Sequence, residues 1–151
     1  MIGRSRLAAT YLAVFAHRRD EVPRREAFAA KAVERTEKLL QQKGSDAATV
    51  MNMALFWLAC DVPETCDPAR AETLARRSIE LSQNTLPRPW LTLARALHVL
   101  KRNDDACQAV ARALELFPSG NQGFRVDAME LATELRCGAK AFVVDEQPER
   151  N

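Results

Sequence analysis

The stretch that decides the fold is WLTLARALHVLKRNDDACQAVARALELFP, which runs from Trp90 to Pro118. Apolar residues recur every three or four positions in each half, and the polar turn Lys101–Asp104 lies between the halves. Small side chains alternate with large ones, and small residues let two helix backbones approach closely. These small residues are Ala94, Ala106 and Ala113. The stretch therefore predicts two antiparallel helices joined by a short turn.

Outward from this pair, breaks rich in Gly, Pro, Asp and Asn divide the rest of the chain into further helical segments. Only 5 glycines occur, and strand-like alternation never extends beyond a few residues. The sequence thus predicts an all-α protein. The expected helices are Arg4–Arg18, Arg24–Gln42, Ala47–Ala59, Pro68–Leu81, Pro89–Leu100, Asp104–Phe117 and Phe124–Arg136.

Several expected helix ends carry capping residues. Asp67 lies directly before Pro68 and is expected to be the N-cap of the helix Pro68–Leu81. Asn103 is expected to be the N-cap of the helix Asp104–Phe117. Gly44 and Gly138 follow helical segments, and we expect a left-handed glycine to end the helix at these points.

The charge balance excludes some classes of partner. The chain has 22 basic and 20 acidic residues, a net charge of +2, which does not indicate nucleic-acid binding. No apolar run is long enough to cross a membrane, so we expect a soluble protein. Residues 1–19 combine four arginines with an apolar stretch, and they are interpreted as a first helix or, alternatively, as a cleaved targeting segment.

No arrangement of residues predicts catalysis. The four cysteines lack zinc-site spacing and are expected to be reduced, which favours a cytoplasmic protein. The two histidines, His17 and His98, have no catalytic partner at a recognisable spacing, and no glycine-rich phosphate loop follows a strand. The sequence thus predicts no enzyme, cofactor or metal site.

The helix pair from Trp90 to Pro118 resembles the tetratricopeptide repeat (TPR) in its pattern of large and small residues. The matching residues are Trp90, Leu93, Ala94, Leu97, Ala106, Val110, Ala113 and Pro118. A looser copy precedes it, with an extended turn that is similar to the TPR tails of bacterial signalling proteins. Its residues are Met53, Ala54, Trp57, Ala71, Ala75 and Ser78. A third copy is expected at Leu7, Ala8, Tyr11, Ala29, Val33 and Thr36.

The resemblance implies an α-solenoid of three helix pairs and a capping helix over residues 4–138. The expected repeats are 4–42, 47–81 and 87–118, the cap is 124–136, and the tail 139–151 is expected to be flexible. On the cap, inward positions are assigned to Val126, Met129, Ala132 and Leu135, and outward positions to Glu130, Glu134 and Arg136.

The resemblance also implies a binding surface, because the first helix of each TPR pair lines the concave face. The candidate peptide-binding residues are Arg6, Asn52, Leu55, Arg88, Arg95 and His98. The arginines favour a protein or peptide partner that carries acidic residues. The residues of the chaperone-binding carboxylate clamp are matched only by Asn52 and, loosely, Arg88. A structural module that forms homo-oligomers through its terminal helices is the alternative.

Overall fold

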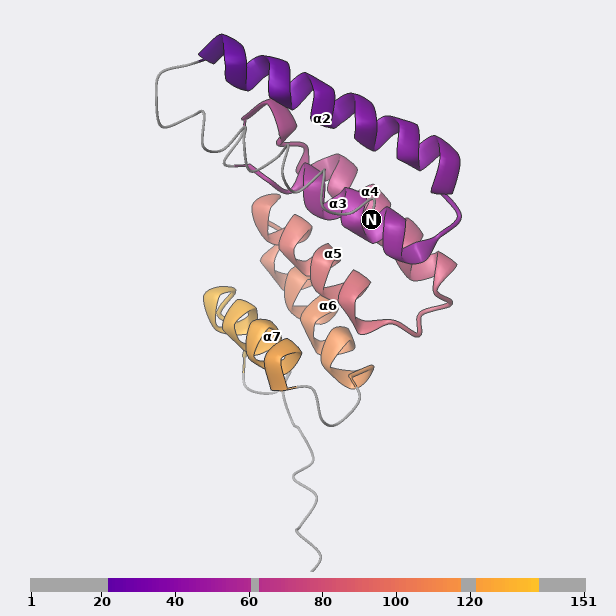
Figure 1. Ribbon diagram of the computed structural model, residues 1–151. Helices are drawn as coiled ribbons and strands as arrows, with labels where there is room; N and C mark the ends of the chain where they lie inside the picture. Colours follow the sequence, from indigo (N-terminus) through magenta and orange to yellow (C-terminus); the bar gives the residue numbers. More distant parts are fainter. Residues whose placement is uncertain (1–21, 61–62, 118–121, 139–151) are drawn as a thin grey trace, which may run out of the picture.

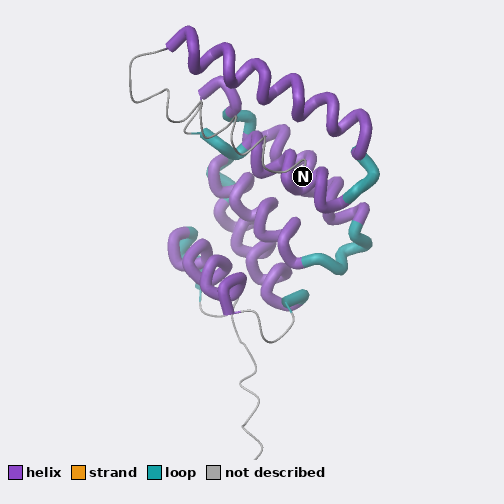
Figure 2. The backbone as a smooth tube through the Cα atoms, in the orientation of Figure 1, coloured by secondary structure: helices purple, strands orange, loops and turns teal. Residues whose placement is uncertain are grey.

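A computed structural model describes residues 22–60, 63–117 and 122–138. The α-helices in these ranges form one continuous stack (Figure 1). The helices are α2 (Val22–Lys43), α3 (Ala47–Trp57), α4 (Pro68–Leu81), α5 (Pro87–Val99), α6 (Asn103–Glu115) and α7 (Gln122–Glu134). The 3-10 turn η2 (Pro63–Thr65) lies between α3 and α4. No strand occurs in these ranges, so the all-α class is confirmed there (Figure 2).

The six described helices begin and end within two residues of the predicted bounds, and α4 matches its bounds at both ends. The predicted helix Arg4–Arg18, the first half of the third TPR-like copy and the tail 139–151 lie outside the described residues. Within the described part, no helix has the length and apolar character needed to cross a membrane.

Side-chain capping at α4 is confirmed, whereas the capping predicted at α6 is wrong. The Asp67 carboxylate accepts a hydrogen bond from the Arg70 amide at 3.0 Å. Helix α6 instead begins at Asn103 itself, with Arg102 as a cap residue that makes no side-chain capping bond. The Asn103 amide oxygen lies 3.3 Å from Nδ1 of His98. Asn103 is thus the first residue of the helix and not its cap.

Lysine and arginine, rather than glycine, adopt the left-handed conformation at two helix ends. Lys101 has φ 63° and Arg136 has φ 56°. After α5, the Arg102 amide donates to Leu97 O at 2.9 Å, which satisfies a carbonyl that the helix end leaves free. Gly44 and Gly138 show no positive φ, so the predicted left-handed glycines are wrong. At Gly44, an added Cβ would lie 2.4 Å from Leu40 O, so close backbone approach explains the glycine.

The start of α3 makes stability depend on pH. Hydrogen bonds from the Thr49 hydroxyl and amide hold the pKa of the Asp46 carboxyl below its ordinary value. Asp46 therefore stabilises the fold above its unfolded pKa, and this contribution disappears as the pH falls through the lower folded pKa.

We expect Asp46→Asn to remove this pH dependence, because asparagine caps a helix without titrating. The melting temperatures of the two proteins, measured by circular dichroism, should differ near neutral pH and converge well below about pH 4. A difference that stays constant through the acid range would contradict the role of the Asp46 carboxylate.

Equivalent positions in two successive helix pairs form the centre of the core. Helix α3 packs on α4 and α5 packs on α6, while α4 and α3 also contact α5. The small positions that the sequence aligns between the pairs are all 0 % exposed, as the close approach of the backbones requires. They are Ala54 and Ala94, Ala71 and Ala106, Ala75 and Val110, and Ser78 and Ala113.

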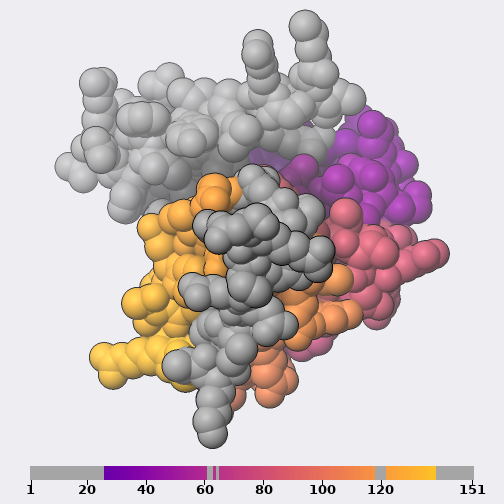
Figure 3. All heavy atoms as spheres, turned by 90° about the horizontal axis from the view of Figure 1, so that it is seen from below, coloured from indigo at the N-terminus to yellow at the C-terminus, as the bar shows by residue number. Residues whose placement is uncertain are grey.

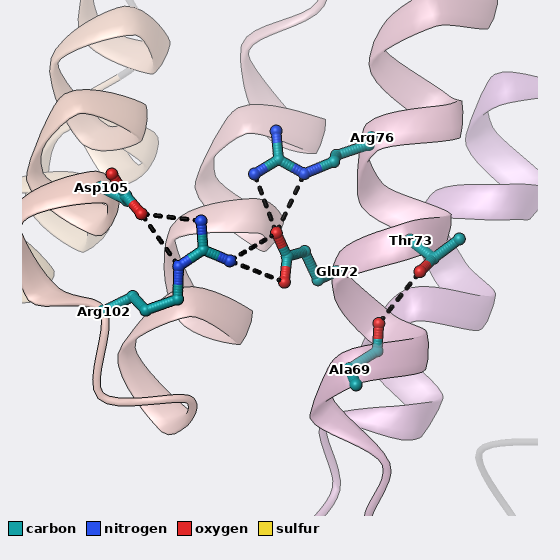
Figure 4. Close-up of polar contacts among 6 residues, drawn as sticks. All are labelled: Ala69, Glu72, Thr73, Arg76, Arg102 and Asp105. Atoms are coloured by element: carbon teal, nitrogen blue, oxygen red, sulfur yellow. Dashed lines mark hydrogen bonds and ion pairs between the residues drawn. The ribbon is translucent and has the colours of Figure 1, made fainter.

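Polar contacts tie the two pairs together. The Glu72 carboxylate of α4 accepts hydrogen bonds from Arg76 at 2.8 Å and from Arg102 at 2.9 Å (Figure 4). Arg102 also donates to Asp105 at the start of α6, and this bond, together with the charge of Glu72, raises the pKa of its guanidinium. Glu72 thereby joins α4 to the turn between α5 and α6.

Contacts around Trp57 hold helix α2 against the α3–α4 pair. The Trp57 side chain is 5 % exposed. The Arg70 guanidinium lies 4.4 Å from the centre of the Trp57 ring and forms an ion pair with Glu37 of α2. In α2 itself, Ala29 and Thr36 are buried and Val33 is half-buried, in agreement with the inward positions predicted for them.

Helix α7 lies against α6, at the opposite end of the described helices from α2 (Figure 1), and it forms the yellow region of Figure 3. Ala132 and Leu135 are buried as predicted, and Glu130, Glu134 and Arg136 are exposed as predicted. Val126 is 52 % and Met129 37 % exposed, so their predicted inward positions are wrong. The buried stripe of α7 instead consists of Phe124, Ala128, Leu131 and Ala132.

All four cysteines are oxidised, which corrects the prediction of reduced thiols. Cys60 is bonded to Cys66, with Cα atoms 4.3 Å apart, and Cys107 is bonded to Cys137, with Cα atoms 5.6 Å apart. The first bridge closes the connection between α3 and α4, and the second joins α6 to the segment that follows α7. Both distances are short enough for bridging because the connection folds back in one case and the helices pack together in the other.

Candidate functional site

A hollow of about 320 Å³ lies where α3, α5 and α7 meet. We call it the α3–α5–α7 hollow. Its walls combine apolar side chains with two arginines and one carboxylate. The lining residues are Met51, Leu55, Arg88, Leu91, Thr92, Arg95, Gly123, Phe124 and Asp127.

Helix α5 supplies the largest share of the lining because one of its faces is directed into the hollow. The helix begins at Pro87, where the missing amide hydrogen of proline costs nothing. Leu91 is 5 % and Thr92 3 % exposed, and they form the floor. The Thr92 hydroxyl donates to Arg88 O at 3.1 Å, so this polar side chain is satisfied within the helix.

Arg88 and Arg95 stand on that same face of α5, seven residues or about 10 Å apart along the helix axis. Both side chains are exposed. Neither forms an ion pair with any residue that the structure describes, unlike Arg70, Arg76, Arg102 and Arg112. Two guanidinium groups are thus available to an anionic ligand, and guanidinium binds carboxylates through paired hydrogen bonds.

Three of the six predicted site residues line the hollow: Leu55, Arg88 and Arg95. Asn52 is exposed on α3 but is not part of the lining. The imidazole of His98 lies between Asn103 and Glu134, at 3.3 Å from each, where it connects α5 to α6 and α7. Arg6 lies outside the described residues.

Sequence reasoning did not find the contribution of α7, which is Gly123, Phe124 and Asp127. Phe124 is 6 % exposed and stacks on Phe117 at the end of α6, with ring centres 5.1 Å apart. The signal for this wall was weak, because α7 carries apolar residues on two faces and the sequence does not show which face packs on α6.

The hollow offers an apolar floor, two guanidinium groups on one wall and a carboxylate on another. In the described part of the chain, no group of three or more His, Cys, Asp or Glu side chains is placed to hold a metal ion. A scan against protein-family models and a search of the curated proteins both find no match to this chain.

Proposed function

We propose that the chain is a TPR-like helical-repeat module that binds an acidic segment of a partner protein in the α3–α5–α7 hollow, without catalysis. The repeat assignment is supported by the shared burial of the equivalent positions in the two helix pairs, from Ala54 and Ala94 onwards. Repeats that stack in this way bury a continuous core and leave the face of their first helices free for a ligand.

The observation that carries the binding proposal is the pair of arginines without ion-pair partners among the described residues. Their spacing of about 10 Å lies between the roughly 6.6 Å and roughly 13 Å that separate side chains i and i+2, and i and i+4, on one face of an extended peptide. An extended ligand with carboxylates at every second position, all on one face, therefore reaches both Arg88 and Arg95 through their long side chains. Its apolar side chains then lie over Leu91 in the floor and the neighbouring α3 side chains Met51 and Leu55.

Asp127 restricts the orientation of such a ligand. Its carboxylate lies on the α7 side of the hollow, so an acidic side chain is repelled there and attracted toward α5. We expect the ligand to place a neutral or basic residue beside α7.

The alternative function, self-association as a structural module, has one observation in its favour. Val126 and Met129 leave apolar surface exposed on α7, the last described helix. Light scattering distinguishes the two functions by the molar mass in solution. Self-association gives a multiple of the monomer mass, whereas the peptide-binding proposal expects the mass of a monomer.

The oxidised cysteines also change the expected location. The cytoplasmic expectation rested on reduced thiols, whereas disulfides persist mainly in oxidising compartments. We propose that the protein functions in an oxidising compartment, in which both disulfides form and persist.

The double variant Arg88→Glu/Arg95→Glu tests the binding proposal. The probe is a fluorescein-labelled peptide of alternating glutamate and leucine, and its anisotropy measures affinity. We expect Kd to rise by more than about tenfold, because two charge-assisted contacts become repulsive. Stability should change little, about 0.5 kcal/mol or less per site, since both side chains are exposed.

The matched control is Lys31→Glu/Arg35→Glu, which changes the net charge equally on exposed positions of α2. It should leave the affinity for the probe nearly unchanged, and a lysine-leucine peptide should not bind the wild type. If both variants lose affinity equally, the loss comes from the change in net charge and not from Arg88 and Arg95, and the proposed site is overturned.

A further inference from the structure

We propose that the disulfide between Cys107 and Cys137 is a redox-controlled latch, which holds α7 in place as one wall of the α3–α5–α7 hollow. The proposal rests on the proposed function of that hollow and adds its regulation. In the oxidised protein the wall is ordered and the peptide binds; in the reduced protein the wall loosens and the affinity falls.

The position of the bridge suits a latch. Cys107 lies in the second turn of α6, and Cys137 lies three residues beyond the end of α7, so the bond ties the far end of α7 to α6. Both cysteines are half-buried. A reductant therefore reaches the bridge without unfolding of the core.

Without this bridge, α7 is held by few large side chains. Its buried stripe contains two alanines, Ala128 and Ala132, which contribute little apolar area. The larger contacts come from Phe124, Leu131 and Leu135, together with a contact of 3.3 Å between His98 and Glu134. A helix of 13 residues is marginally stable in isolation, so the order of α7 depends on how it is attached.

The link to ligand binding is direct, because the first turns of the same helix supply Gly123, Phe124 and Asp127 to the hollow. A helix moves largely as a unit, so release at Cys137 affects the wall at the opposite end. Loss of order in α7 removes the apolar ring of Phe124 and the carboxylate that orients the ligand.

The redox step requires a dithiol reductant, either a small molecule or a protein. One reductant thiolate attacks a sulfur of the bridge and forms a mixed disulfide, and the second displaces the remaining cysteine. Two electrons and two protons pass to Cys107 and Cys137, which become thiols, and the reductant leaves as its own disulfide.

The test compares Cys107→Ser/Cys137→Ser with the matched control Cys60→Ser/Cys66→Ser, whose bridge contributes no residue to the hollow. Amide hydrogen exchange reports the order of α7, and the glutamate-leucine probe reports affinity. In the first variant we expect exchange across α7 to be at least about tenfold faster, and Kd to be several-fold higher. In the control, both quantities should equal those of the wild type.

If the first variant does not fold, the same two measurements are made on Cys60→Ser/Cys66→Ser before and after reduction with dithiothreitol. If the rate of amide hydrogen exchange in α7 is the same with and without the bridge, the latch is overturned. Faster exchange with unchanged or tighter probe binding overturns its control of the hollow. If the wild-type protein does not bind the probe at all, the proposed function itself is contradicted. This result differs from probe binding that is equally tight with and without the Cys107–Cys137 bridge, which overturns only the latch.

Discussion

Replacement of Ala94 by arginine is expected to lower the free energy of unfolding by about 3 kcal/mol or more. Ala94 is 0 % exposed and belongs to the set of small residues at equivalent, fully buried positions of the two helix pairs. Arginine would need space that the close-packed backbones do not provide, and it would bring a charge to a position without a partner. Chemical denaturation followed by circular dichroism measures the loss.

Ala30→Arg is the control, because it adds the same side chain at an exposed position of α2. Its effect should stay within about 0.5 kcal/mol of zero. If the two variants unfold at the same denaturant concentration as the wild type, the small positions do not determine the packing of the helices.

Trp57→Ala is expected to cost about 3 to 5 kcal/mol of stability, the range for loss of a large aromatic side chain from a core. The substitution leaves a cavity between α3 and α4. It also removes the ring on which Arg70 stacks and the perpendicular contact with Phe56, whose ring centre is 5.0 Å away. The fluorescence of Trp90, the other tryptophan, follows unfolding in this variant.

Trp57→Phe should cost clearly less, for two reasons. Phenylalanine fills most of the same volume, and it has no counterpart of the Trp57 indole N–H, which is buried without a hydrogen-bond partner among the described residues. An equal loss for phenylalanine and alanine would show that Trp57 does not act through the apolar volume that it fills.

The helices could be predicted because their signals are local. Asp67 and Pro68 mark the start of α4, and the apolar spacing of α5 and α6 identifies their buried faces. The cap of α6 could not be predicted, because it depends on the left-handed conformation of Lys101 in the preceding turn. Glycine is the usual residue there, and lysine carries no comparable signal.

The α7 wall and the bridges depend on tertiary structure. Two stripes of α7 are apolar, one containing Val126 and Met129 and the other Phe124 and Leu131, and contact with α6 buries the second. The pairing of Cys107 with Cys137 joins residues separated by 30 positions, and only the packing of α7 on α6 brings them together. Part of the candidate site was predictable because Arg88 and Arg95 share one face of one helix.

Glu72 has a consequence for how the two helix pairs unfold. Its side chain is 16 % exposed and accepts from Arg76 within α4 and from Arg102 in the neighbouring pair. If the second pair melts alone, this carboxylate loses one guanidinium, and Arg102 loses a neighbour that favours its charge. In a linear array of units, such a shared contact is a nearest-neighbour coupling energy, which raises the cost of a boundary between folded and unfolded units. The ion-pair network therefore favours all-or-none melting of the two pairs over their separate fraying.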